Sequence, residues 1–394
     1  MRDPADLTNH ERLWSLAAIM TMIGVAGMGM GLTGPLITYA FEGAGYSRTI
    51  IGLNSATFAV AILISAPFTP AIMRSLGTVR TLWVSIALAV AAVLIFRMTD
   101  NVIVWFLIRF AFGIAMTMMF VATEVWINLI AREETRGRAL GIYTTCLAGG
   151  FAAGLSILYL VGSQGWTPII VTAVVFALAA LPLIPAYKIS PRAEKPETKT
   201  PFLPFLRRAP SALGAALVFG AIEMGILNLL NIYALRAGLT EAQGTLMLLA
   251  TAAGNIIGPL LIGIMADRMN RRVLLVLCAA TGTLASVLIP TVIGNPLLLY
   301  GILFLNGAII TGLYNVGLTI IGMRFTRGAL AGANAAYTMM YGLGALIGPF
   351  LGGVAMDFWD PNGLMAVLLA LSGGYALFVF ARIRRASSLT EGAA

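Results

Sequence analysis

Twelve long apolar segments constrain this chain more than any other feature of its sequence. A helix needs about 20 apolar residues to cross the hydrocarbon core of a bilayer, and segments of that length recur along the whole chain. Hydrophobic residues make up 59% of the 394, charged residues only 10%, and the mean hydropathy is +0.92. A water-soluble protein cannot keep so much apolar surface away from water. The sequence therefore predicts an all-α membrane protein.

The connections between these segments are short, with one exception. Residues 188–210 are rich in proline and charge, which is typical of a linker. We expect it to be cytoplasmic and to divide the chain into two six-helix bundles, residues 1–187 and 211–394, the second ending in a short cytoplasmic tail. The first apolar run is too long for the core of a signal peptide, so we expect it to remain as a membrane helix. The expected spans are 13–41, 49–73, 80–98, 103–130, 137–163, 166–187, 211–236, 243–266, 273–293, 297–323, 331–357 and 362–382.

Lysine and arginine are distributed unevenly over the connections. With the N-terminus in the cytoplasm, 21 of the 25 basic residues lie on that side, Arg48, Arg97 and Arg236 lie on the other, and Arg109 falls within a helix. The positive-inside rule therefore predicts that both termini are cytoplasmic. This topology accounts for the net charge of +9, and we expect no nucleic acid among the partners.

Two short loops repeat between the predicted halves. Residues 44–47 (AGYS) match residues 237–240 (AGLT) at an offset of 193, and residues 135–137 (TRG) match residues 326–328 (TRG) at an offset of 191. Chance similarity of short loops is the alternative, but both pairs flank equivalent helices at nearly the same offset. Two parallel six-helix halves related by an axis along the membrane normal are an architecture of transporters.

The connection at 263–272 carries the most specific motif, GIMADRMNRR. It resembles G-x-L-A-D-R-x-G-R-R, the signature cytoplasmic loop of the major facilitator superfamily. The resemblance implies two pseudo-symmetric six-helix bundles in the bacterial inner (plasma) membrane. It also implies that Asp267, with Arg268 and Arg271, gates the cytoplasmic side from a position near the start of the segment 137–163, where a helix dipole favours an anion. Asn270 replaces the family's glycine and is expected to tolerate the same left-handed backbone.

The equivalent loop of the first half departs from this pattern. Arg74 stands where the family has aspartate, while Gly77 keeps the turn glycine. A cation cannot make the dipole contact, so we expect an asymmetric gate. Gly348 and Pro349, within GALIGPFLGG at 344–353, resemble an antiporter element that belongs to the family's fifth helix, not its eleventh. Export is therefore not implied, and close helix packing explains these glycines equally well.

Within the superfamily the chain resembles the bacterial YcaD-like proteins. The resemblance rests on Glu124 twelve residues before an Arg-Gly-Arg sequence at 136–138, on LYNV at 313–316, and on a basic residue at position 74. That subgroup has no well-defined substrate, so the resemblance informs the fold more than the cargo.

Glu223 is the strongest candidate for coupling chemistry. Ionisable residues deep in a membrane are costly and usually face a cavity or a partner, and Glu223 lies midway along its segment, where transporter sites are found. Such a carboxyl group is expected to bind and release a proton. Asn231 lies eight residues further on and about 80° around the helix. The alternative is a glutamate that only hydrogen-bonds a neighbouring helix.

Glu124 is the second candidate, about 10 Å from the cytoplasmic end of its helix, with Asn128 on the same face. Its pseudo-symmetric counterpart is Asn315, beside Tyr314. These residues could bind a polar substrate or gate the inner mouth, and the alternative is a solvated glutamate near a helix end.

Arg109 lies nearer the outer end of the same helix, about 22 Å from Glu124, too far for direct pairing. Proton coupling, implied by the resemblance, and an arginine that reaches the outer interface remain equally open. Asn334, Tyr337 and Tyr341 form a polar and aromatic stripe that favours helix packing over substrate contact.

Several function classes are excluded by what the sequence lacks. It has no P-loop, no nucleophile–histidine pair and no metal-ligand cluster, and only two separate cysteines. We expect no enzyme activity, no cofactor and no bound metal. The sequence favours a monomeric, proton-coupled secondary transporter of a small amphipathic solute, surrounded by membrane lipid. A passive facilitator and a non-transporting receptor or scaffold with the same fold remain the alternatives.

Overall fold

The computed structural model describes residues 8–130, 136–186, 203–325 and 327–391. These residues form α-helices, and twelve stretches among them are long and apolar enough to cross a membrane. The prediction of an all-α protein with twelve membrane helices is confirmed.

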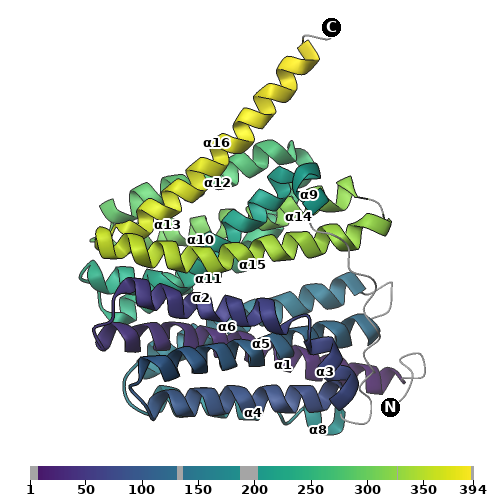
Figure 1. Cartoon of the computed structure of the whole chain (residues 1–394), viewed down its shortest axis with the longest axis vertical. Coiled ribbons are helices and arrows are strands. Elements are labelled where there is room, and N and C mark those ends of the chain that lie inside the picture. The colour runs from purple at the N-terminus through teal and green to yellow at the C-terminus, as the bar shows by residue number, and fades with distance from the viewer. Residues whose placement is uncertain (1–7, 131–135, 187–202, 326, 392–394) are drawn as a thin grey trace. The chain divides into compact units, whose positions relative to one another are not determined.

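Contacts divide the chain into two compact units (Figure 1). The first unit comprises Met1–Ala40 and Thr57–Glu197, and the second comprises Phe41–Ala56 and Thr198–Ala394. The predicted division at 188–210 remains a prediction, because much of that linker lies outside the described residues. The helices up to Ala186 are α1 (Asn9–Gly43), α2 (Arg48–Ser65), α3 (Thr69–Leu76), α4 (Thr78–Arg97), α5 (Val102–Ile130), α6 (Arg136–Val161), α7 (Thr167–Leu178) and α8 (Leu183–Ala186).

The remaining helices belong to the second unit, where α10 packs along α15 and α12 packs along α16 (Figure 1). They are α9 (Leu203–Arg208), α10 (Pro210–Arg236), α11 (Glu241–Arg268), α12 (Arg271–Thr291), α13 (Pro296–Ile310), α14 (Gly312–Arg324), α15 (Arg327–Phe358) and α16 (Gly363–Glu391).

Three expected spans are interrupted. The segment 49–73 was expected to be one helix, but α2 ends at Ser65, and α7 likewise ends at Leu178 within the segment 166–187. Pro67 and Pro182 follow these ends, and proline lacks the N–H that a continuing helix needs while disfavouring helical backbone in the residue before it. The segment 297–323 divides at Thr311, whose hydroxyl donates to the carbonyl of Ala308 at 3.1 Å. Such hydroxyl-to-carbonyl bonds commonly bend helices.

Glycine allows α10 and α15 to approach almost to backbone contact. A Cβ atom on Gly344 would lie 1.9 Å from the carbonyl oxygen of Leu217, and one on Gly348 would lie 2.1 Å from that of Ala221. In the first unit, α1 and α6 cross in the same way, with Gly150 packed on the carbonyl of Gly24. Small residues at such crossings permit close van der Waals packing in a membrane.

The second unit also contains the junction between α1 and α2, which is fixed by a group of charged residues. Asp357, near the end of α15, accepts hydrogen bonds from the backbone N–H groups of Arg48 and Thr49 at 2.9 and 2.8 Å. It thereby caps the N-terminus of α2, where the helix dipole favours an anion. Arg48 also pairs with Asp360, and Arg236 pairs with Glu42 at 2.5 Å. We call Glu42, Arg48, Arg236, Asp357 and Asp360 the charged cluster.

Candidate functional site

Glu223 lies in the middle of α10 and is half-buried. It is the only charged residue between Pro210 and Leu235. Its carboxylate Oε2 accepts a hydrogen bond from the hydroxyl of Tyr341 on α15 at 2.7 Å. The candidate proton site is therefore held against the neighbouring helix by one short, charge-assisted bond.

Aromatic rings surround this pair. The ring of Phe219, one turn before Glu223 on α10, lies with its centroid 6.1 Å from that of Tyr341 and 5.6 Å from that of Tyr314 on α14. The rings of Tyr314 and Tyr341 are 5.7 Å apart and nearly perpendicular. Phe219 is buried, whereas both tyrosines are half-buried. We call Phe219, Tyr314 and Tyr341 the aromatic cluster.

Tyr337 packs against Tyr314 of the aromatic cluster. It is fully buried, its ring lies 5.2 Å from that of Tyr314, and its hydroxyl donates to the Tyr314 carbonyl at 2.6 Å. A Cβ atom on Gly317 would lie 2.5 Å from that hydroxyl, so the glycine makes room for the tyrosine. The stripe of Asn334, Tyr337 and Tyr341 is therefore divided: Tyr337 packs α15 on α14, Tyr341 meets Glu223, and Asn334 is exposed.

Three asparagines of α10 and α14 differ in their surroundings, and only Asn231 among them was predicted together with Glu223. Asn231 is fully buried, two turns beyond Glu223 on α10. Asn228 donates from Nδ2 to the carbonyl of Met224 on its own helix at 2.8 Å. Asn315 is half-buried beside Tyr314 on α14. The structure thus brings Tyr314 into the surroundings of Glu223, through Tyr341 and Phe219.

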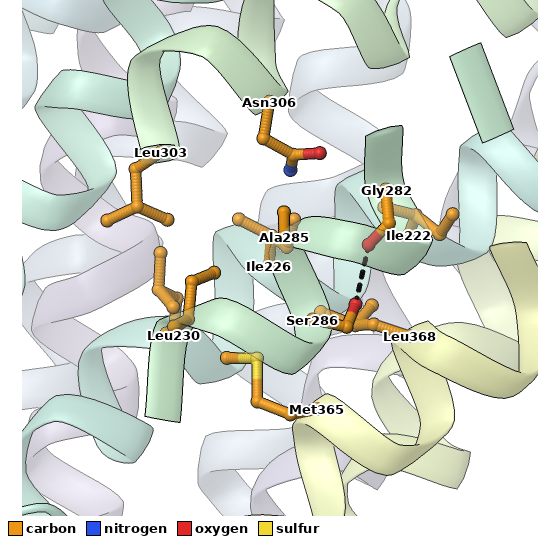
Figure 2. Close-up of a pocket in the computed structure, with 11 residues that line it drawn as sticks. Ile222, Ile226, Leu230, Gly282, Ala285, Ser286, Leu303, Asn306, Met365 and Leu368 are labelled. Carbon is orange, nitrogen blue, oxygen red and sulfur yellow. Dashed lines mark hydrogen bonds between the residues drawn. The ribbon is translucent and has the colours of Figure 1, made fainter. Parts of the chain in front are cut away.

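A small cavity lies on another side of α10 and is lined by Ile222 and Ile226 (Figure 2). Its volume is about 10 Å³, which is close to the space of a single water molecule. Asn306 points into it, is 4% exposed, and has an Oδ1 atom without a hydrogen-bond partner among the described residues. Ser286 uses its hydroxyl to donate to the carbonyl of Gly282 at 2.8 Å. The cavity suits a water molecule and is too small for a solute.

Glu124 lies on α5 in the first unit and is exposed. Tyr143 on α6 is close enough to interact with its charge, and the Tyr143 hydroxyl lies 3.1 Å from that of Thr123. Trp126, two residues beyond Glu124 on α5, is fully buried. The side chain of Asn128 lies outside the part of the chain that the structure describes. A tyrosine of a neighbouring helix bonds Glu223 directly, whereas Tyr143 meets the residue before Glu124.

Arg109 is 5% exposed, and its guanidinium lies 5.0 Å from the ring centroid of Phe58 on α2. This geometry is a cation–π contact inside the first unit. The side chain does not extend to the surface, as the interface alternative would require.

The predicted gating residues of the connection at 263–272 lie at helix ends. Asp267 and Arg268 are exposed in the last turn of α11, and Arg271 opens α12. Asn270 was expected to tolerate the left-handed backbone of the family's glycine, but the structure does not require that conformation: its φ is −62°, and its Oδ1 accepts from the N–H of Arg272 at 3.0 Å. Asparagine here is a helix N-cap, a role that glycine fills without a side-chain bond. The placement of Asp267 near the other half remains a prediction.

In the first unit, Arg74 is exposed on α3, and Gly77 separates α3 from α4 with φ of 90°. That backbone region favours glycine. In the second unit, Gly348 contacts α10, and the carbonyl of Pro349 would lie 2.2 Å from a Cβ atom on Gly52 of α2. Gly348 and Pro349 therefore lie where helices pack closely, and their part in gating stays a prediction.

No group of three or more histidine, cysteine or acidic side chains able to hold a metal is found in the described ranges. Cys146 and Cys278 are both free thiols.

Comparison with known proteins places the chain among transporters. The sequence model described as the Major Facilitator Superfamily matches residues 19–258 and 237–393. YfkF of Bacillus subtilis, an uncharacterized MFS-type transporter, is 26% identical over 370 residues, covering 92% of this chain and 94% of that protein. YcaD of Escherichia fergusonii, also an uncharacterized MFS-type transporter, is 23% identical over 345 residues, covering 86% of this chain and 88% of that protein.

Solved structures agree on the fold. A point mutant of the nucleoside transporter NupG superposes with a TM-score of 0.74 at 15% identity, covering 95% of this chain and 99% of that one. A bacterial homologue of the human lysosomal transporter Spinster, inward-facing and unoccupied, gives a TM-score of 0.71 at 14% identity, covering 95% and 96% of the two chains.

Proposed function

The chain belongs to the major facilitator superfamily, a family of membrane transporters and not of enzymes, and from that premise we propose that it is a proton-coupled secondary transporter. It moves a small amphipathic solute by alternating access, and Glu223 is the residue that takes up and releases the proton. The predicted location in the bacterial inner membrane, with both termini cytoplasmic and the protein acting as a monomer, belongs to this proposal. The orientation rests on the distribution of basic residues.

The observation that carries the proposal is the setting of Glu223. A carboxyl group in the middle of an apolar membrane helix costs folding free energy, and groups of this kind are usually kept for a function. The hydrogen bond from Tyr341 occupies one acceptor position and leaves capacity on the carboxylate for a further partner. Proton binding removes the charge of Glu223. The free energy of keeping this side chain in an apolar environment is therefore lower when it is protonated than when it is ionised. That difference is what couples a proton to a conformational cycle.

Glu124 and Arg109 are secondary participants in this proposal. Glu124, exposed beside Tyr143, serves a polar part of the substrate near the inner mouth. Arg109, buried against Phe58, sets the electrostatic field of the first unit. Asp267, Arg268, Arg271 and Arg74 take part in closing the cytoplasmic side, and the helix crossing at Gly348 and Pro349 bends during gating.

Ligand-induced thermal stabilisation is the first test. The purified protein and its Glu223→Gln variant are screened against metabolite and drug libraries at about pH 6 and about pH 8, with Glu241→Gln as the control for loss of a carboxylate elsewhere in the second unit. Glutamine retains an acceptor for the Tyr341 hydroxyl and cannot ionise. We expect ligands that stabilise the wild type and the control differently at the two pH values, with the difference lost in Glu223→Gln.

A ligand found in this way is then tested for transport in proteoliposomes with an imposed pH gradient. Accumulation driven by the gradient supports coupling. Equilibration that ignores both pH and the Glu223 substitution indicates the passive facilitator. A ligand that binds but never crosses the bilayer indicates the receptor or scaffold.

A further inference from the structure

We propose that Glu223 and the aromatic cluster form a binding site for an organic cation, such as a protonated amine or a quaternary ammonium or phosphonium group. The inference rests on the proposed function, because it takes the proton site to be part of the substrate site. It names the charge and chemical class of the solute, which the proposed function leaves open.

The first argument is charge. Ion pairs of the second unit join the residues of the charged cluster, and none of these pairs includes Glu223. On α10 the nearest charged residue in sequence is Arg236, thirteen residues and about 20 Å away along the helix. Residues 296–323 and 332–356, which hold the tyrosines, contain no charged residue. When ionised, Glu223 therefore lacks a basic side chain in the helical stretches that form its surroundings, and a cationic solute would supply the missing charge.

The second argument is the aromatic cluster itself. Cations bind over aromatic faces at about 6 Å from the ring centroid or closer, and desolvation strengthens the attraction. Phe219 lies four residues before Glu223, on the same face of α10. Tyr314 and Tyr341 approach from two other helices at 5.6 and 6.1 Å from Phe219. Three rings and one carboxylate therefore converge from α10, α14 and α15, and both tyrosines are half-buried.

The bond from Tyr341 to Glu223 orients this site. It holds the carboxylate against α15 and leaves the tyrosine ring beside Phe219. A neutral polar solute such as a sugar needs several hydrogen-bonding side chains, and the cluster supplies few. An anion is excluded by the carboxylate charge. Apolar, cationic solutes satisfy both parts of the site.

Helix packing alone is the competing explanation of the same bond. However, α10 and α15 are already held together through Gly344 and Gly348, whose positions meet the backbone of α10 without a side chain between them. A carboxylate within a membrane helix is a costly way to add to such a contact, since apolar residues of similar size pack as well or better. The packing explanation predicts that glutamine serves as well as glutamate, and this makes the two explanations separable.

The test measures equilibrium binding of two probes of matched shape and opposite charge, tetraphenylphosphonium and tetraphenylborate, to the full chain in lipid nanodiscs. Empty nanodiscs correct for partition into lipid. We expect saturable binding of tetraphenylphosphonium, weakened at least about tenfold by Glu223→Gln and unchanged by Glu241→Gln. Phe219→Leu, which keeps apolar volume but removes the ring, is expected to weaken binding about 2- to 30-fold. Tetraphenylborate is expected to show no saturable binding.

Dodecyltrimethylammonium serves as a second cation, so that the result does not depend on one shape. The proposal is overturned if the folded protein binds neither cation, if tetraphenylborate binds as tightly as tetraphenylphosphonium, or if Glu223→Gln binds both cations like the wild type. Thermal unfolding and gel filtration establish that each variant is folded. If cation binding depends on Glu223 but no proton-driven transport is found, the proton coupling is refuted and the cation site is supported. Proton-driven transport of a neutral ligand without cation binding would refute the cation site and support the coupling.

Discussion

Replacing Asp357 by alanine is expected to loosen the first turn of α2. The Asp357 carboxylate accepts from the backbone N–H groups of Arg48 and Thr49 at 2.9 and 2.8 Å and from the Thr49 hydroxyl at 2.5 Å. It also lies 3.6 Å from the Arg48 guanidinium. Alanine removes all four interactions at once and leaves two N–H groups at the start of the helix without this acceptor.

The magnitude follows from two contributions. Loss of a helix N-cap costs about 0.5–2 kcal/mol. The Arg48 and Asp357 side chains are 17% and 25% exposed, so their ion pair is partly screened and contributes about 0.2–1 kcal/mol. The sum is about 1–3 kcal/mol of local stability, which corresponds to amide exchange accelerated about 5- to 150-fold.

Amide hydrogen exchange followed by mass spectrometry measures this change where it occurs, in peptides that cover residues 48–52. Asp357→Asn keeps one acceptor but loses the charge, so it should fall between the wild type and Asp357→Ala. High salt should reduce the contribution of the ion pair to local stability, while the contribution of the N-cap hydrogen bonds should stay the same. Unchanged protection of these amides in Asp357→Ala, or an equal loss over the whole chain, would refute the reasoning.

Three further substitutions test the packing of the second unit. Gly344→Val should cost at least about 1–3 kcal/mol, because its Cβ would lie 1.9 Å from a backbone oxygen of α10; thermal unfolding of this variant is compared with Gly301→Ala, where no atom lies within 4 Å. Asn306→Leu should be neutral or stabilise the protein by up to about 1 kcal/mol, because an apolar side chain replaces a buried amide beside a cavity of the size of one water molecule, and a fall in melting temperature would contradict this. Tyr337→Phe should lower stability by about 1 kcal/mol through loss of the 2.6 Å bond to a carbonyl of α14, while a melting temperature equal to that of the wild type would show that the bond contributes nothing.

The membrane architecture could be predicted because the thickness of the bilayer sets the length of the helices. A bilayer of fixed thickness requires helices of about 20 apolar residues, so hydropathy alone located all twelve spans. The interruptions at Pro67 and Pro182 were also open to sequence reasoning, since proline ends helices for local reasons. The helix cap at Asn270 was not foreseen, because asparagine both tolerates left-handed backbone and caps helices, and the choice depends on backbone geometry that the residue itself does not determine.

The candidate site could be predicted only in part. Glu223 was evident as a charge within an apolar segment, but its partner Tyr341 lies 118 residues away, and no local pattern links the two. Phe219 was overlooked because phenylalanine is common in membrane helices. Its spacing of four residues from Glu223 was the available signal. The charged cluster was missed for a related reason: Arg48 and Arg236 served as topology markers, and their acidic partners come from distant loops and helix ends.

Gly220 of α10 lies at the same helix crossing as Gly344 and Gly348 of α15, the glycines that resembled a gating element. A Cβ atom on Gly220 would lie 2.3 Å from the carbonyl oxygen of Tyr341, so α10 meets α15 at the very residue whose hydroxyl binds Glu223. The crossing therefore sets how far the tyrosine ring stands from Phe219 and from the carboxylate. Packed helices of this kind shift between discrete arrangements more readily than they deform. A small sliding of α15 along α10 would change the bond between Tyr341 and Glu223, and binding or loss of a charge at Glu223 would in turn favour one arrangement.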